Sequence, residues 1–122
     1  MEESRTFGSF FKQKRIALGF TLRSFCEKHG LDAGNISRLE RGILSPPKEE
    51  ILKKYAKLLK LKKGSDEWYE FFDLAAAGSG RLPKEFMDEE ILGRMPLLFR
   101  TIRGKKITKE KLDKLIKVIK ES

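Results

Sequence analysis

The sequence contains very few of the residues that build redox, metal or nucleophilic sites. Cys26 is its single cysteine and His29 is its single histidine. One cysteine cannot form an internal disulfide, which is typical of proteins of the reducing cytoplasm. One cysteine and one histidine supply too few ligands for a zinc site, and the chain has no glycine-rich phosphate loop and no clear Ser/His/Asp set. We therefore predict no metal, no cofactor and no enzymatic activity.

The sequence also lacks a long apolar run. No stretch approaches the roughly 20 apolar residues that a membrane-spanning helix requires. Glu2 and Glu3 lie where a secretion signal carries basic residues. These absences predict a cytoplasmic protein with no membrane partner.

Basic residues outnumber acidic ones by 27 to 18, which gives a net charge of +9. The excess is concentrated at residues 100–122, which carry nine Lys/Arg and three Asp/Glu, while residues 46–99 are neutral overall. A basic balance suits a polyanionic partner such as nucleic acid. The charge alone does not establish that partner, because many small lysine-rich proteins are basic for solubility.

The spacing of apolar residues predicts a chain built almost entirely of helices. Five are expected in the first part of the chain, at residues 5–18, 21–29, 33–41, 47–61 and 66–77. Pro47 suits the first residue of the fourth helix, and Ser65 suits the N-cap of the fifth. The residues expected to face a shared core are Phe7, Phe10, Phe11, Leu18, Ile36, Leu39, Ile51, Tyr55, Leu58, Leu59, Trp68, Phe71, Phe72 and Leu74.

Two glycines around Ser79 predict a joint between a domain over residues 5–77 and a helical extension over residues 81–122. Short helices are expected in the extension at residues 88–93 and 96–103, the second of them beginning at Pro96. Thr108 is expected to cap a further helix over residues 109–120, in which an apolar stripe alternates with lysines. This apolar surface must be covered, either by the first domain or by a second copy.

The most informative segment covers residues 21–42, which predict two short helices joined by a tight turn. Gly30 permits the positive φ of the turn, and Asp32 is a good N-cap for the second helix. Ile36 and Leu39 face inward. The polar and basic residues of this helix lie off that apolar line: Asn35, Ser37, Arg38 and Arg41. A short polar helix held at an angle by its predecessor is what the major groove of DNA accepts.

These residues resemble the lambda-repressor-like, or Cro/C1-type (XRE family), helix-turn-helix domain of bacterial and phage regulators. The resemblance covers about residues 5–76 and implies an all-α fold, a five-helix DNA-binding bundle with a helical C-terminal extension. It also implies an inward ion pair between Arg15 and Glu40. The matching positions are Phe7, Gly8, Arg15, Gly19, Thr21, Phe25, Cys26, Gly30, Ile36, Ser37, Leu39, Glu40, Gly42, Pro46, Pro47 and Ala56.

The helix of about residues 33–41 is expected to contact bases through Ala33, Gly34, Asn35, Ser37 and Arg38. Ala33 can touch only a thymine methyl, and Gly34 lets the backbone approach closely. Base recognition therefore depends mainly on Asn35 pairing with adenine and Arg38 with guanine, while Ser37 supports them. The structural alternatives are a solvated arginine and a capping asparagine.

Groups that flank this helix are expected to contact DNA phosphates: Thr21, Arg23, Arg41 and Lys48. The family often has a phosphate-contacting glutamine at the start of its second helix. Leu22 replaces it here, so that contact is not expected.

The resulting prediction is a sequence-specific transcriptional regulator that binds double-stranded operator DNA as a homodimer and represses its own or a neighbouring operon. The alternative is the antitoxin of a toxin–antitoxin pair, which would bind a toxin through residues 81–122, most of all residues 95–102. A structural or RNA-binding role would instead predict no preference among DNA sequences.

Overall fold

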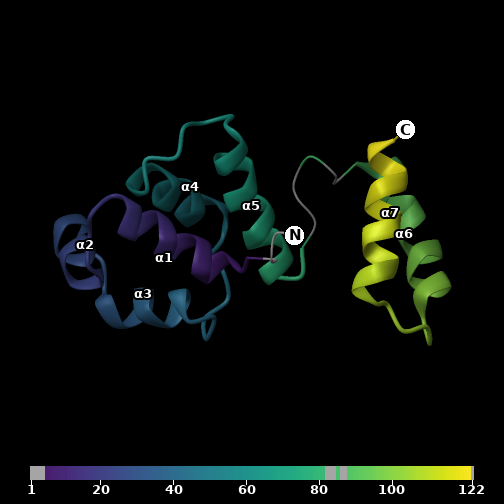
Figure 1. Ribbon diagram of the computed structural model, residues 1–122, viewed down its shortest axis with the longest axis horizontal. Coiled ribbons are helices and arrows are strands. Elements are labelled where there is room, and N and C mark those ends of the chain that lie inside the picture. The colour runs from purple at the N-terminus through teal and green to yellow at the C-terminus, as the bar shows by residue number, and fades with distance from the viewer. Residues whose placement is uncertain (1–4, 82–84, 86–87, 122) are drawn as a thin grey trace. The chain divides into compact units, whose positions relative to one another are not determined.

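The computed structural model describes residues 5–81, 85 and 88–121. This part of the chain contains seven helices and no strand. They fall into two units, α1–α5 and α6–α7 (Figure 1). The helices are α1 (Phe7–Ala17), α2 (Leu22–His29), α3 (Ala33–Glu40), α4 (Glu49–Leu58), α5 (Asp66–Gly78), α6 (Glu89–Ile102) and α7 (Lys109–Lys120).

Side-chain caps fix the starts of the first three helices. Thr6 and Thr21 each form a capping box with the serine three residues later, at the starts of α1 and α2. The Asp32 carboxylate accepts the backbone N–H of Asn35 at 2.8 Å, as the sequence predicts. These bonds satisfy N–H groups that a helix start leaves without partners, so the helix boundaries are set locally.

The helix α4 is shorter than the predicted span of residues 47–61. It begins at Glu49 after Lys48 as N-cap, so Pro47 lies outside the helix and not at its first position. Glu49 and Glu50 occupy the first turn, where carboxylates interact favourably with the helix dipole. Lys60 adopts φ 55° just beyond the C-cap, which prevents the helix from continuing.

The prediction that Ile51 faces the core is wrong, because its side chain is 47% exposed. The buried stripe of this region is Leu52, Ala56 and Leu59, which recurs at helical spacing one residue later than predicted. Leu52, Ala56 and Leu59 belong to the core cluster, whereas Tyr55 and Leu58 pack against it and are only partly buried.

An aromatic cluster forms the centre of the first unit. Phe71 of α5 lies 5.0 Å from Phe7 and 6.0 Å from Phe10 between ring centroids, and Phe11 meets Phe25 of α2 at 5.9 Å. The core residues of this unit are Phe7, Phe10, Phe11, Phe25, Cys26, Ile36, Leu39, Leu52, Ala56, Leu59, Phe71 and Ala75. These contacts hold α1 against α2 and α5.

The helix α6 differs from the prediction of two short helices. It is one continuous helix with Pro96 inside it, so Pro96 is not a helix start. Proline removes one backbone donor, which leaves the carbonyl four residues earlier without its helical partner. That residue is Leu92, and its 39% exposure allows water to reach the site. The helix therefore tolerates the proline.

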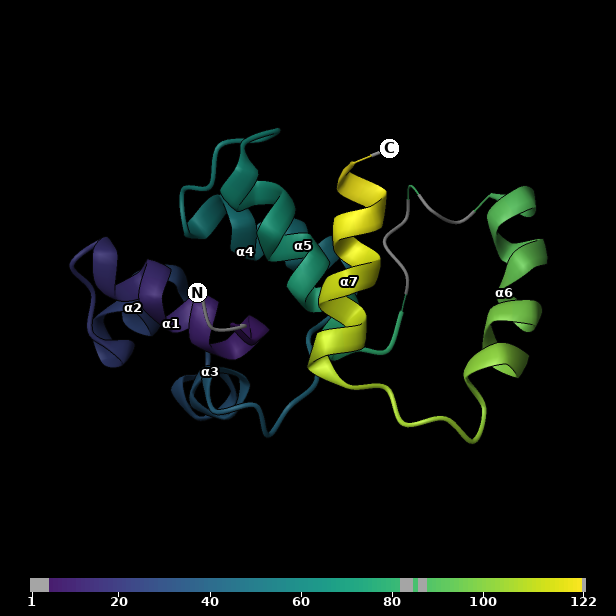
Figure 2. The same cartoon turned by 45° about the vertical axis from the view of Figure 1, so that its right-hand side comes forward.

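The second unit has no core of its own. No residue of α6 or α7, both described throughout, is buried. Figure 2 shows the two helices standing apart, joined through the turn that contains Gly104. Along the parts of the chain that the structure describes, none of the helices is both long enough and apolar enough to cross a bilayer.

Candidate nucleic-acid interface

The turn between α2 and α3 sets the angle of the second helix. Gly30 is the C-cap of α2 with φ 66° and ψ 37°, a left-handed conformation that favours glycine. Leu31 N–H then bonds the carbonyl of Cys26 at 2.9 Å, and Asp32 starts the next helix. Three residues therefore connect the two helices, and α3 packs on both α2 and α1.

A buried ion pair anchors the end of α3 to α1. Arg15 donates from Nε and Nη2 to the two carboxylate oxygens of Glu40 at 2.8 and 2.9 Å, and from Nη1 to the carbonyl of Phe20 at 2.9 Å. Each charged side chain is only 6% exposed. The bond to Glu40 raises the pKa of Arg15 above its ordinary value. The guanidinium thus ties together α1, α3 and the loop before α2.

Gly8 allows α1 and α3 to cross at close range. A Cβ on Gly8 would lie 2.5 Å from the backbone oxygens of both Leu39 and Glu40. Backbone atoms cannot move aside as a flexible side chain can, so only glycine fits this crossing. The opposite, outward side of α3 is left exposed (Figure 1).

The structure brings the predicted base-contacting residues together on α3. Ala33, Gly34, Asn35 and Arg38 are exposed. Ser37 is half-buried, and its hydroxyl and carbonyl accept Nε–H of Arg41 at 3.2 and 3.3 Å. The four exposed residues therefore present small and polar groups to solvent. Ser37 is less available, because it already accepts a hydrogen bond from Arg41.

The predicted phosphate-contacting residues fall into two kinds. Arg23 and Lys48 are exposed, although Arg23 Nε also lies 3.7 Å from Glu27. Thr21 uses its hydroxyl within the capping box of α2, and Arg41 is turned back toward Ser37. Arg23 and Lys48 therefore offer the freer cations on either side of α3.

Two structural features escaped the sequence reasoning. One is the close crossing at Gly8, for which a glycine inside an amphipathic helix is the available signal. The other is a hydrogen bond from Arg38 Nη2 to Asn35 Oδ1 at 2.7 Å. Residues three apart on a helix are neighbours, so this spacing could have suggested the contact.

The described residues contain no group of three or more His, Cys, Asp and Glu side chains able to hold a metal ion. Burial raises the pKa of Cys26, which disfavours its thiolate form.

A family model described as Helix-turn-helix matches residues 11–64. Residues 11–64 form a helix-turn-helix domain. The match runs from the middle of α1 to the turn before α5 and includes both α2 and α3. It confirms the resemblance to the Cro/C1-type domain and, with the helices of the structure, the all-α fold.

No curated protein and no solved structure matches the chain. The helix-turn-helix domain is that of a DNA-binding transcriptional regulator. In such domains the second helix of the motif enters the major groove, which makes the exposed side of α3 the candidate interface.

Proposed function

We propose that the protein is a sequence-specific repressor that inserts α3 into the major groove of an operator near its own gene. The observation that carries this proposal is the exposed polar end of α3, held by the buried Arg15–Glu40 pair and by the crossing at Gly8. A rigid support of this kind keeps a recognition helix in a fixed orientation. Base contacts are assigned to Ala33, Gly34, Asn35, Ser37 and Arg38.

Phosphate contacts are assigned to Thr21, Arg23, Arg41 and Lys48. Thr21 would act by placing the start of α2 against a phosphate, because its hydroxyl and its own backbone N–H are both bonded to Ser24 in the capping box. These contacts would fix the register of α3 and contribute the salt dependence of binding.

We further propose that the protein binds DNA as a homodimer. One recognition helix contacts only a few base pairs, and twofold symmetry doubles the contact over two half-sites. The second unit supports this proposal, because its apolar residues are exposed in a single copy. They are Leu92, Leu97, Leu98, Phe99, Ile102, Ile107, Leu112, Leu115, Ile116, Val118 and Ile119.

The antitoxin alternative uses the same exposed surface. Leu97 and Phe99 are 56% and 52% exposed, and they lie in the stretch proposed to bind a toxin. Sedimentation equilibrium of the full chain distinguishes the two proposals. A dimer that dissociates on Leu115→Glu supports self-association, whereas a monomer at high micromolar concentration leaves this surface for a different protein.

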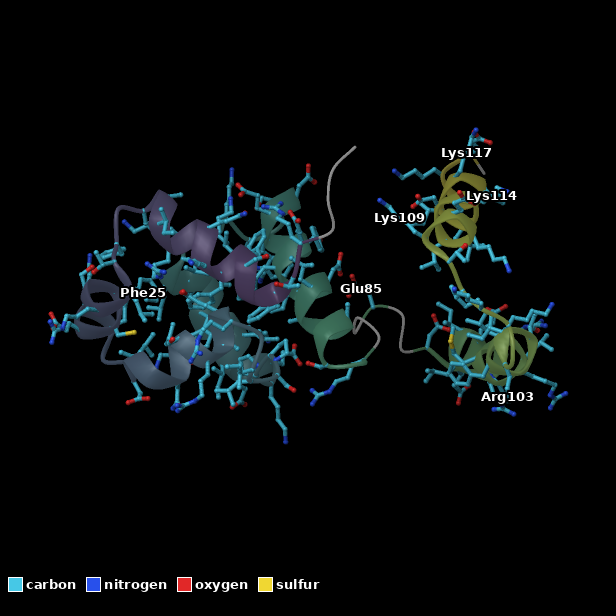
Figure 3. The ribbon with its side chains drawn as sticks, turned by 60° about the horizontal axis from the view of Figure 1, so that its bottom comes forward. Phe25, Glu85, Arg103, Lys109, Lys114 and Lys117 are labelled. Carbon is cyan, nitrogen blue, oxygen red and sulfur yellow. The ribbon has the colours of Figure 1, made fainter. Side chains whose placement is uncertain are left out.

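The DNA proposal is tested by fluorescence anisotropy with a duplex from upstream of the gene and a scrambled duplex, at several salt concentrations. We expect tighter binding to the upstream duplex, and a loss of that preference in Arg38→Ala. Arg103→Ala is the matched control, because it removes an exposed arginine from the second unit (Figure 3). Equal, steeply salt-dependent binding to both duplexes would mean that only phosphates are contacted.

A further inference from the structure

The two side chains with the greatest capacity to recognise bases are bonded to each other. Arg38 Nη2 donates to Asn35 Oδ1 at 2.7 Å across one turn of α3. The Asn35 backbone N–H is itself held by Asp32 at 2.8 Å. Asp32 thus holds the backbone of residue 35 at the start of the helix, and the side-chain oxygen of Asn35 holds the guanidinium.

The guanidinium of Arg38 lies close to Gly34. A Cβ on Gly34 would lie 3.7 Å from both Nη1 and Nη2 of Arg38 and 3.3 Å from Asp32 Oδ2. The guanidinium thus passes over residue 34 toward the N-terminal end of α3. In helix-turn-helix complexes, this is the end of the recognition helix that reaches the base edges.

The hydrogen bond changes what the pair can offer to DNA. A free asparagine pairs with adenine by using its oxygen as acceptor and its NH₂ as donor. Here one of the oxygen's two lone pairs already accepts from the guanidinium, so the pair as a whole presents more N–H donors than acceptors, from the amide and the guanidinium. Guanine presents two acceptors, N7 and O6, on its major-groove edge, whereas adenine presents one acceptor and one donor.

We infer that Asn35 is a positioning residue for Arg38 and that the pair recognises guanine as a unit. This inference rests on the proposed function, in which α3 enters the major groove. It replaces the expectation of independent contacts, with Asn35 on adenine and Arg38 on guanine.

The test begins with selection of binding duplexes from a randomised pool by the full-length protein. Affinities for the selected duplex are then measured for the wild type, Asn35→Ala, Arg38→Ala and the double variant. We expect each single variant to lose guanine preference by roughly 5- to 150-fold, the range of a bidentate arginine–guanine pair. The double variant should lose little more, because both residues act on one base.

Two further measurements distinguish positioning from direct contact. Replacing the guanine with 7-deazaguanine removes the N7 acceptor, so it should weaken the wild type but leave Asn35→Ala almost unaffected. Asn35→Asp keeps an oxygen to hold Arg38, so it should retain the preference for guanine over adenine even if overall affinity falls. Circular dichroism of each variant verifies that the helices remain intact.

The inference is overturned if Asn35→Ala relaxes an adenine position while the preference for guanine persists. It is also overturned if the losses of the two single variants add in the double variant. In both cases the wild type still selects a sequence, so the proposed function stands. If the wild type selects no sequence at all, the proposed function fails, and that result is distinct from either of the others.

Discussion

The two units of this molecule are built from the same kind of amphipathic helix but differ in what covers the apolar side. In the first unit, α1–α5 bury Phe10, Phe11, Phe25 and Phe71 completely. In the second, α6 and α7 bury no residue, and Ile119 remains 65% exposed. Most helical stability in proteins comes from packing the apolar face. The first unit therefore carries its own stability, whereas the second leaves its apolar side uncovered.

Removing an aromatic ring from the first core should give the largest difference between the units. We expect Phe71→Ala to lower the free energy of unfolding by about 3–5 kcal/mol, because the ring is fully buried against Phe7 and Phe10. Leu115→Ala, on the exposed side of α7, should change the unfolding of the first unit by less than about 0.5 kcal/mol.

Urea denaturation followed by the fluorescence of Trp68 measures this effect. The chain has one tryptophan, and it lies on α5, so its signal reports the first unit. An equal loss of unfolding free energy in Phe71→Ala and Leu115→Ala would contradict the contrast between the units.

Removing one charge of the buried Arg15–Glu40 pair should destabilise the first unit nearly as much. Glu40→Gln leaves Arg15 charged and buried without its counter-charge, so we expect a loss of about 3–5 kcal/mol. Glu70→Gln makes the same change in the pair between Arg5 and Glu70, whose side chains are 37% and 35% exposed. That control should cost at most about 1 kcal/mol. The same urea denaturation experiment measures both variants. Similar losses of unfolding free energy in the two would argue against the anchoring role of Arg15.

The crossing of α1 and α3 should respond to a single methyl group. Gly8→Ala places a Cβ against two backbone oxygens and should destabilise the first unit by about 1–3 kcal/mol. Gly93→Ala in α6 meets no atom within 4 Å, so it should be neutral or favour the helix. Thermal unfolding monitored by circular dichroism compares the two variants, and a neutral Gly8→Ala would show that the crossing can relax.

A smaller effect is expected from pH. His29 contacts Phe25 at 4.7 Å between ring centroids, and burial, with Lys28 and Lys60 nearby, lowers its pKa below the ordinary value. The unfolded chain therefore binds a proton that the folded chain resists. The free energy of unfolding should not be reduced by His29 above about pH 6.5, the ordinary pKa of histidine, and should fall as the pH drops through that value.

Urea midpoints between pH 7.5 and pH 5.5 measure this dependence in the wild type and in His29→Gln. The urea midpoint should fall less between pH 7.5 and pH 5.5 in His29→Gln than in the wild type. A wild type that becomes more stable toward pH 5.5 would contradict the direction of the pKa shift.

Local signals made the helix starts predictable. Asp32, Ser65 and Thr108 cap α3, α5 and α7 as their residue types indicate. Such caps depend on atoms within three residues, so a sequence reveals them. The prolines were less informative, because Pro47 lies before α4 and Pro96 lies inside α6. A proline can stand before a helix or inside one, and the local sequence does not state which.

The candidate site was predicted as a set of residues but not as an arrangement. The spacing placed Asn35 and Arg38 on the outward side of α3, which agrees with their exposure. It also makes the two side chains neighbours, but whether Arg38 folds back to bond Asn35 depends on the rotamers of both side chains. The partner of the second unit is equally beyond prediction, since an amphipathic pattern indicates an apolar side and not what covers it.

The most direct test of the account asks which unit meets DNA. Backbone amide resonances of the full chain, labelled with ¹⁵N, are followed during titration with the upstream duplex. We predict that the largest shifts fall on Gly34, Asn35 and Arg38 in α3. Dominant shifts on Lys114 and Lys117, which project from α7 in Figure 3, would place the contact on the basic second unit and contradict the proposed role of α3.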